Sequence, residues 1–146
     1  MKVKQLSLFL ENKPGALRRP VQLLADAQFN ILTLSLADTQ QFGILRVIVR
    51  DWERARQLLE KNGFVVNVTD VVAIEVPDKP GELAEILGVI EKARVNIEYL
   101  YGFTLKEEHK GLLAFRFDDP DKDIAILKKH RLNPVRNVDL FERLAR

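Results

Sequence analysis

ENKPGALRRP, residues 11–20, begins a pattern that returns later in the chain as PDKPGELAEI, residues 77–86. The two stretches share the tripeptide KPG and lie 66 residues apart (77 − 11). Further along, GIL at 43–45 is matched by GLL at 111–113, now 68 residues apart (111 − 43), so one insertion of two residues (68 − 66) separates the registers. A fixed period that runs through the chain indicates a tandem duplication.

Length and composition indicate two small globular units. The chain has 146 residues, of which 47% are apolar and 30% are charged, a balance typical of soluble globular domains. A unit of about half this length buries only ~60% of its unfolded surface, so we expect it to pack against the other unit or a second copy. The net charge of +2 comes from dispersed Lys and Arg, which gives no reason to expect nucleic acid or an anionic membrane as a partner.

Several features are missing from the sequence. There is no cysteine, which excludes disulfides, thiolate catalysis and thiolate metal sites. The N-terminal stretch MKVKQLSLFLENKPG lacks the long apolar region of a signal peptide, and no apolar run approaches the ~18 residues of a membrane span. We therefore expect a cytoplasmic protein that does not enter a membrane.

The first half of the chain predicts four strands and two helices. Alternating apolar residues indicate strands, and apolar residues at helical spacing follow the first KPG and again follow Asp51, which is a good N-cap. Asn62 and Gly63 close the second of these helices. The expected strands are 4–10, 31–37, 43–50 and 64–68.

The second half repeats this order. One helix carries Leu83, Leu87, Ile90 and Ala93, and another is capped by Asp119 with Pro120 at its first position. A helical tail is expected at 139–146. The expected strands are 72–76, 95–104, 111–117 and 132–135.

Each half therefore reads strand–helix–strand–strand–helix–strand. This order is that of a ferredoxin-like βαββαβ unit, an α+β fold in which helices cover one face of an antiparallel sheet. We place the first unit at residues 1–69 and the second at 70–146, which includes the short C-terminal helical tail.

The second strand of each unit carries apolar residues on both faces. Leu34 and Leu36 point one way and Ala37 the other, while Tyr99 and Tyr101 lie opposite Leu100. In a sheet with one face exposed to solvent, apolar and polar residues should alternate more regularly along each strand. We infer that the helix-free face or the strand edge is covered by the other unit or by another subunit, so a homo-oligomer, most simply a dimer, is expected. The alternative is a sheet that tolerates exposed Leu and Tyr.

The repeated turn has the chemistry to hold a free amino acid. The amides of Gly15, Ala16 and Leu17 would point outward at a helix N-terminus, which suits a carboxylate. Asn12 in the first turn and Asp78 in the second have oxygens that accept hydrogen bonds from an ammonium group. The alternative is purely structural, because strand-to-helix turns often use Asn, Asp and Gly for their geometry alone.

The whole chain resembles the ACT domain in its tandem form, a stand-alone protein of two fused ACT units. The segments that carry the resemblance are ENKPGAL at 11–17, NI at 30–31, LADTQQFGILRVIV at 36–49, VPDKPGELAEIL at 76–87 and VNIEYLY at 95–101. The resemblance implies that the first strand–helix turn of each unit binds an amino acid at an interface between units, with the turn of one unit facing the second strand of the other.

The same resemblance implies a set of ligand-binding residues. In the first unit these are Asn12, Gly15, Ala16, Leu17, Asn30, Ile31, Ser35 and Asp38, and in the second they are Asp78, Gly81, Glu82, Leu83, Asn96, Ile97, Tyr99 and Tyr101.

The two units also differ in sequence at two places that matter for the turn and its helix. Pro20 lies where the first helix should already be running, so that helix should start late or kink. Asn12 in one turn stands where Asp78 stands in the other, so the two sites should not be equivalent.

Other signals point away from nucleic acid and metal. The octet KGLLAFRF at 110–117 echoes an RNA-recognition motif, but Leu112 and Ala114 occupy the places that need base-stacking aromatics. The acidic run at 118–123 lacks a calcium loop's glycine and glutamate, since Ile124 and His130 stand at those positions. We expect no metal, no cofactor and no catalytic residues.

Two functional hypotheses remain, and a third is weaker. The first is a regulatory module that senses a free amino acid between paired units and acts in trans through a shift between states. The second is a non-catalytic accessory subunit of an amino-acid biosynthetic enzyme, as the small subunit of acetolactate synthase is. The third, an enzyme, is weakest because no acid–base or nucleophile cluster stands out in the sequence.

Overall fold

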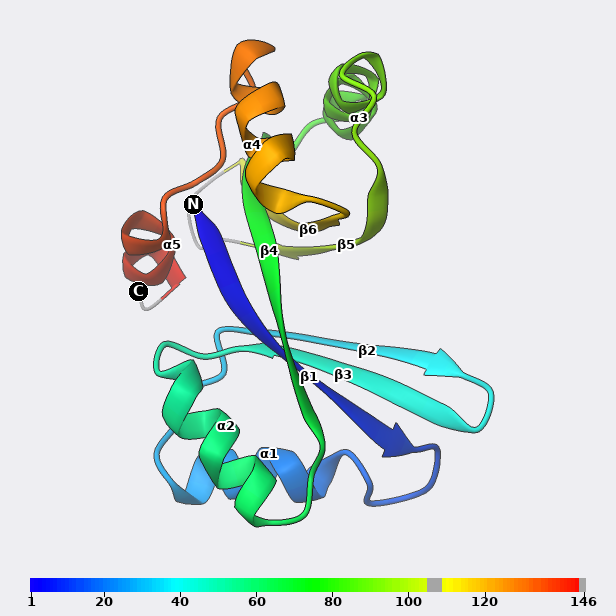
Figure 1. Cartoon of the computed structure of the whole chain (residues 1–146), viewed down its shortest axis with the longest axis vertical. Helices are drawn as coiled ribbons and strands as arrows, with labels where there is room; N and C mark the ends of the chain where they lie inside the picture. The colour runs from blue at the N-terminus through cyan, green and yellow to red at the C-terminus, as the bar shows by residue number, and fades with distance from the viewer. Residues whose placement is uncertain (105–108, 145–146) are drawn as a thin grey trace. The chain divides into compact units, whose positions relative to one another are not determined.

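The computed structural model describes residues 1–104 and 109–144 and divides the chain into two compact units (Figure 1). The first unit is Lys4–Thr69, and the second is Asp70–Arg146 together with Met1–Val3. The chain passes from one to the other inside a single strand, β4 (Val66–Pro77), where the sequence predicts two strands, 64–68 and 72–76. The last two residues of the expected helical tail, 145–146, lie outside the described residues.

The first unit is built from a three-strand antiparallel arrangement and two helices. Its strand β3 (Phe42–Ile48) pairs with both β1 (Lys2–Glu11) and β2 (Thr33–Thr39). The helices are α1 (Arg18–Asp26) and α2 (Trp52–Lys61). Their apolar stripes pack on alternate strand residues in one core, which consists of Leu6, Leu8, Leu10, Leu24, Leu45, Val47, Val49, Ala55, Leu59 and Val66.

The second unit has the same plan. Strand β6 (Lys110–Phe117) pairs antiparallel with β4 and with β5 (Ile97–Thr104). Helices α3 (Glu82–Lys92) and α4 (Pro120–Lys129) cover one face. The core beneath them consists of Val72, Ile74, Val76, Ile86, Ile90, Val95, Leu113, Phe115, Phe117, Ile124 and Leu127. The expected α+β fold with antiparallel strands and helices is confirmed.

The duplication extends to the registers and the helix caps. Leu8 opposite Leu45 in the first unit becomes Ile74 opposite Leu113 in the second. Asp51 accepts a hydrogen bond from the Arg54 amide at 3.3 Å, and Asp119 does the same for Lys122 at 3.3 Å, so both predicted caps are confirmed. Each cap satisfies one amide that a helix N-terminus leaves without a partner.

Pro20 has the effect that the sequence predicts. Helix α1 begins at Arg18, whereas α3 begins at Glu82, the counterpart of Ala16 (82 − 66). The first helix thus starts two residues late (18 − 16). Pro20 falls in its first turn, where the missing amide costs no helical hydrogen bond, and its ring is buried.

The strand expected at 132–135 is wrong. This segment forms no strand, and the hydrogen bond that ties it to β4 runs from the Val135 amide to the Ala73 carbonyl at 2.8 Å. Pro134 has no amide to donate, so it interrupts any ladder through this segment.

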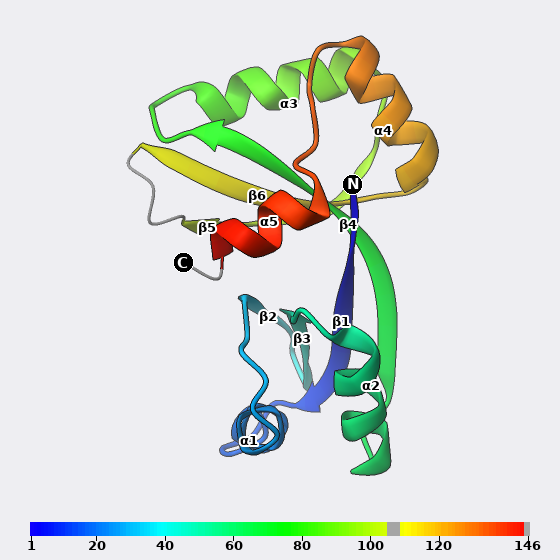
Figure 2. The same cartoon turned by 90° about the vertical axis from the view of Figure 1, so that its left-hand side faces the viewer.

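The expected C-terminal helix is present as α5 (Asn137–Leu144). Glu75 alternates with the core residues Ile74 and Val76 and therefore points to the sheet face away from α3 and α4. Arg143 of α5 reaches Glu75 at 2.6 Å, so α5 lies on that opposite face (Figure 2). Leu140 of α5 is fully buried.

Candidate functional site

The first KPG turn, residues 11–17, is held by its own backbone. The Asn12 amide donates to the Gln41 carbonyl at 3.0 Å, which fixes the turn to the β2–β3 hairpin. Within the turn, the Lys13 amide donates to the Glu11 carbonyl at 3.0 Å, and the Ala16 amide donates to the Lys13 carbonyl at 3.3 Å. The turn then leads directly into α1.

The second KPG turn, residues 77–83, has the same hydrogen bonds at the same repeat positions. The Asp78 amide donates to the His109 carbonyl at 2.8 Å, which corresponds to Asn12 and Gln41. The Lys79 amide donates to the Pro77 carbonyl at 3.0 Å, and the Glu82 amide donates to the Lys79 carbonyl at 3.3 Å. The two turns are therefore copies at the level of single hydrogen bonds.

The glycine of each turn has a left-handed backbone. Gly15 has φ +83° and Gly81 has φ +91°, a region that residues with a Cβ adopt only at a cost. A Cβ placed on either glycine would meet nothing within 4 Å. The glycines are thus needed for the backbone path, and the space above them is open to a ligand.

The Ala16 amide does not point freely outward, as the sequence predicts that it should. It donates to the Lys13 carbonyl inside the turn, as the Glu82 amide donates to the Lys79 carbonyl in the second turn. The amides of Gly15 and Leu17 remain the candidates for binding a carboxylate at this helix N-terminus.

The polar side chains of the first turn are partly engaged. Asn12 Nδ2 donates to the Gln40 carbonyl at 3.1 Å, which orients the amide and leaves Oδ1 as its acceptor. Lys13 Nζ lies 2.8 Å from Glu11 Oε2, and the hydrogen bond from Lys13 holds the pKa of the Glu11 carboxyl below its ordinary value. An acceptor and a carboxylate thus flank the turn.

A pocket of about 100 Å³ joins this turn to the edge strand β2. It brings together four of the predicted ligand-binding residues, Asn12, Ala16 and Leu17 from the turn and Asp38 from β2. The other residues of its lining are Leu10, Glu11, Lys13, Leu36 and Gly43. Asp38 is exposed and pairs in the sheet with Gly43, so its carboxylate borders the pocket mouth.

Other predicted residues of the first unit lie elsewhere. Ser35 pairs with Arg46, and because strand residues alternate, it faces the side of β2 opposite Asp38. Asn30 and Ile31 follow the far end of α1, with the length of that helix between them and the turn. Gly15 borders a different and larger pocket of about 530 Å³ on the other side of the turn.

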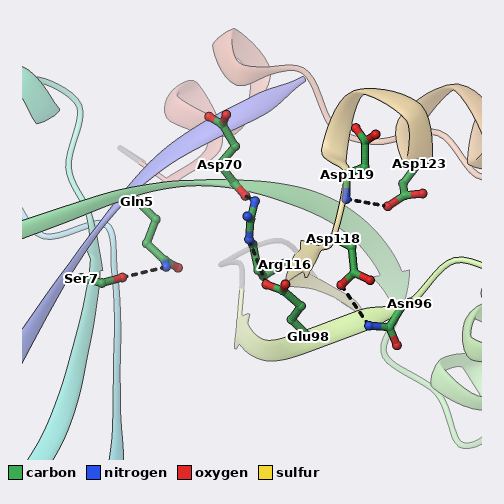
Figure 3. A network of polar contacts seen from close by, with 9 residues as sticks. All are labelled: Gln5, Ser7, Asp70, Asn96, Glu98, Arg116, Asp118, Asp119 and Asp123. Carbon is green, nitrogen blue, oxygen red and sulfur yellow. Dashed lines mark hydrogen bonds and ion pairs between the residues drawn. The ribbon is translucent and has the colours of Figure 1, made fainter.

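In the second unit the predicted residues are also dispersed. Asn96 Nδ2 donates to Asp118 Oδ1 at 2.9 Å and so links the start of β5 to the end of β6 (Figure 3). Tyr99 and Tyr101 pair with Arg116 and Ala114, on the sheet face opposite α3 and α4. Ile97 packs partly buried against the core.

Arg116 pairs with Tyr99 in the sheet, and its side chain makes two hydrogen bonds. Its Nε donates to Glu98 Oε2 at 3.1 Å, and its Nη1 donates to the Asp70 carbonyl at 3.0 Å (Figure 3). The guanidinium therefore ties β5 and β6 to the beginning of the second unit.

Of the predicted residues around the second turn, Asp78 and Gly81 are exposed, Glu82 is half-buried and Leu83 is 41% exposed.

A pocket of about 520 Å³ lies in the second unit at the end of the sheet that leads into the second turn. The sequence places none of the residues that line this pocket in a predicted binding site. They are Val76, Gly102, Phe103, Gly111, Leu112 and Leu113. The signal that the sequence offers is the matched pair Gly43 and Gly111.

A charged cluster lies where α5 meets β4 and β6. Glu75 is 3.3 Å from Lys110 Nζ and 2.6 Å from Arg143 Nη1. Burial works against its ionisation, but the hydrogen bonds from Arg143 and Lys110 outweigh it and hold the pKa of the Glu75 carboxyl below 4.5. The cluster attaches α5 to the sheet.

Metal-binding clusters and membrane-spanning helices are both absent from the described part of the chain. In 1–104 and 109–144, no three His, Asp or Glu side chains gather in a way that could hold a metal ion. Within the same ranges, no helix is both long enough and apolar enough to cross a membrane.

These turns and this fold are those of a known family. Residues 1–144 match the family described as an ACT domain pair. The chain therefore belongs to the ACT domain family and carries two of its units, as the resemblance of the KPG segments predicts. The members of this family are regulatory proteins.

Solved structures agree with this assignment. Protein BT0572 from Bacteroides thetaiotaomicron is 40% identical to the chain, covers 97% of both chains and superposes with a TM-score of 0.88. The ligand-free regulatory subunit of aspartate kinase from Thermus thermophilus is 14% identical, with a TM-score of 0.63 over 87% of this chain and 91% of that one. At that identity the second likeness concerns the fold alone. No curated protein sequence matches the chain.

Proposed function

We propose that the protein is a regulatory module that binds a free amino acid at the strand–helix turns of its ACT units. The observation that carries the proposal is the pocket that joins Asn12, Ala16 and Leu17 to Asp38. It lies next to a glycine whose backbone is left-handed and open above. Both the carboxylate and the ammonium group of an amino acid find partners there.

The chemistry of the proposed binding follows from these partners. The ligand carboxylate is held by the amides of Gly15 and Leu17 at the N-terminus of α1, where the helix dipole favours negative charge. The ligand ammonium donates to Asn12 Oδ1 and to the Asp38 carboxylate, and the charged pair is the stronger of the two contacts. The second turn offers the same amides with Asp78 in place of Asn12.

The proposed output is regulation in trans. An amino acid shifts an equilibrium between two states only if it binds one of them more tightly, so we propose that binding changes how this protein associates with an enzyme or another protein. We also propose that it acts as a homo-oligomer, without catalysis of its own, and in the cytoplasm, which a chain without cysteine suits.

A second candidate is an accessory subunit of an amino-acid biosynthetic enzyme. What favours keeping it is the likeness of fold to a protein that is itself called the regulatory subunit of aspartate kinase. In that case the interface with the enzyme matters more than the free ligand. Co-purification of a large partner with the protein would favour this candidate over a sensor that responds to free amino acid.

The test of the proposed function is thermal melting against each of the twenty amino acids at millimolar concentration. A ligand at 100 times its Kd stabilises by about 2.7 kcal/mol, which raises Tm by several degrees at ~2–4 °C per kcal/mol. We expect one chemical class to raise Tm, and we expect the double variant Asp38→Ala/Asp78→Ala, which removes the carboxylate proposed for each site, to reduce the rise. Glu53→Ala, an exposed carboxylate on α2, is the matched control and should leave the rise intact. A panel in which no amino acid moves Tm contradicts the proposal.

A further inference from the structure

The two pockets described above share three positions of the repeat. Leu10, Leu36 and Gly43 line the first, and Val76, Gly102 and Gly111 line the second. These are matched pairs, by 66 residues for the first two (76 − 10 and 102 − 36) and by 68 for the third (111 − 43). The first pocket borders its KPG turn, and in the second pocket Val76 directly precedes the other turn, residues 77–83.

In the first unit a leucine fills this place. Leu36 Cδ1 lies 3.1 Å from the position that a Cβ on Gly43 would take, so its side chain lies directly over that glycine. The pocket that remains is about 100 Å³, well below the ~300–1,000 Å³ of typical ligand pockets.

In the second unit the same place is open. Gly102 has no side chain and pairs with Leu113, and Gly111, two residues away on β6, is a second glycine in the pocket wall. The pocket is about 520 Å³, which is within the typical range. Its walls are apolar, formed by Val76, Leu113 and their neighbours. The exchange of one leucine for one glycine thus distinguishes two sites that otherwise share a backbone.

We propose that the residue at the repeat position of Leu36 and Gly102 sets the side-chain capacity of each site. The second site takes an amino acid with a large apolar side chain, such as leucine or phenylalanine, whose side chain enters the Gly102 pocket. Its ammonium group meets Asp78, and its carboxylate meets the amides of the second turn. The first site takes no side chain larger than a methyl group. This inference rests on the proposed function, because it assumes that the turns hold the ligand backbone.

The two positions tolerate the substitutions that test this. The backbone of Gly102 is not left-handed, and a Cβ there would lie 3.3 Å from Leu113 Cδ2, the far end of a flexible side chain that can move aside. Leu36 is 48% exposed, so its removal takes little from the core. Both variants should therefore fold, and circular dichroism with a melting curve confirms this before binding is measured.

The experiment is isothermal titration of the full chain with leucine, phenylalanine, alanine and glycine. For the wild type we expect leucine or phenylalanine to bind at one site per chain. Gly102→Leu should weaken that binding at least tenfold while the binding of alanine or glycine persists. Leu36→Gly should add a second site for the large ligand. Gly88→Leu, in α3 with nothing within 4 Å of its Cβ position, is the matched control and should leave all titrations unchanged.

The outcomes separate this inference from the function on which it rests. If amino acids bind but Gly102→Leu leaves the affinity for large apolar ligands unchanged, the inference is overturned and the proposed function stands. If only small or polar amino acids bind the wild type, the inference is overturned in the same way. If none of the twenty amino acids binds, the proposed function fails and this inference fails with it.

Discussion

Single glycines determine the path of both KPG turns. Gly15 and Gly81 have positive φ, and a Cβ on either would have no neighbour within 4 Å, whereas Gly88 lies within helix α3 and is equally unhindered. A Cβ therefore has room at all three positions, but only Gly15 and Gly81 have a left-handed backbone. Substitution by alanine should therefore separate the two effects.

We predict that Gly81→Ala destabilises the protein by about 1–2 kcal/mol, because alanine pays the cost of a left-handed backbone. Gly88→Ala should stabilise it by about 1 kcal/mol, because alanine is the better helix former. Urea unfolding followed by circular dichroism measures both. Equal and small effects at the two positions would show that the turn relaxes to another backbone path.

At the scale of elements, α5 is attached by charge as well as by burial. Glu75 of β4 contacts Arg143 of α5 and Lys110 of β6, and Leu140 is fully buried. The pKa of the Glu75 carboxyl is lower in the folded protein than its ordinary value of 4.5. Its contribution to stability is therefore fully present above about pH 4.5 and is lost as the pH falls through the lower folded value.

We predict that Glu75→Gln makes the unfolding free energy less dependent on pH as the pH falls below about 4.5, because the linked carboxyl is gone. The measurement is urea unfolding at a series of pH values for the wild type and the variant. Glu53→Gln on the exposed face of α2 serves as the control. If the unfolding free energies of the wild type and Glu75→Gln change with pH in parallel, another group is responsible for the loss of stability at low pH.

The sequence predicts most elements correctly because the pattern occurs twice. Asp51 and Asp119 are confirmed as caps by the same hydrogen bond in both units, and the late start of α1 follows from Pro20. The strand expected at 132–135 fails because Pro134 removes an amide, a local fact that the repeat pattern concealed. The place of α5 depends on the contact between Arg143 and Glu75, which no periodicity encodes.

The candidate site was predictable only in part. Asn12, Ala16, Leu17 and Asp38 do meet in one pocket. Leu36 and Gly102 were missed because the sequence alone shows them as ordinary strand residues. Only the structure shows that the Leu36 side chain lies against Gly43 in the first unit. In the second unit the matched residue, Gly102, has no side chain to cover Gly111.

At the scale of the whole molecule, the chain is an ACT domain pair with two copies of one turn. Duplication preserved the backbone of the turn and changed the residues around it. Asn12 corresponds to Asp78, and Leu36 corresponds to Gly102. Such a molecule can keep one mode of holding an amino-acid backbone while its two sites differ in the side chains that they accept.

The most direct test of the central claim, that the turns bind a free amino acid, is a nuclear magnetic resonance titration of ¹⁵N-labelled protein. The ligand is the amino acid that most raises Tm. We predict saturable shifts of the Gly81 and Leu83 amides, of the Gly15 and Leu17 amides, or of both pairs, with the Gly88 amide as an unmoved reference. Saturable binding that leaves both turns unshifted, or no shift anywhere at millimolar amino acid, would contradict it.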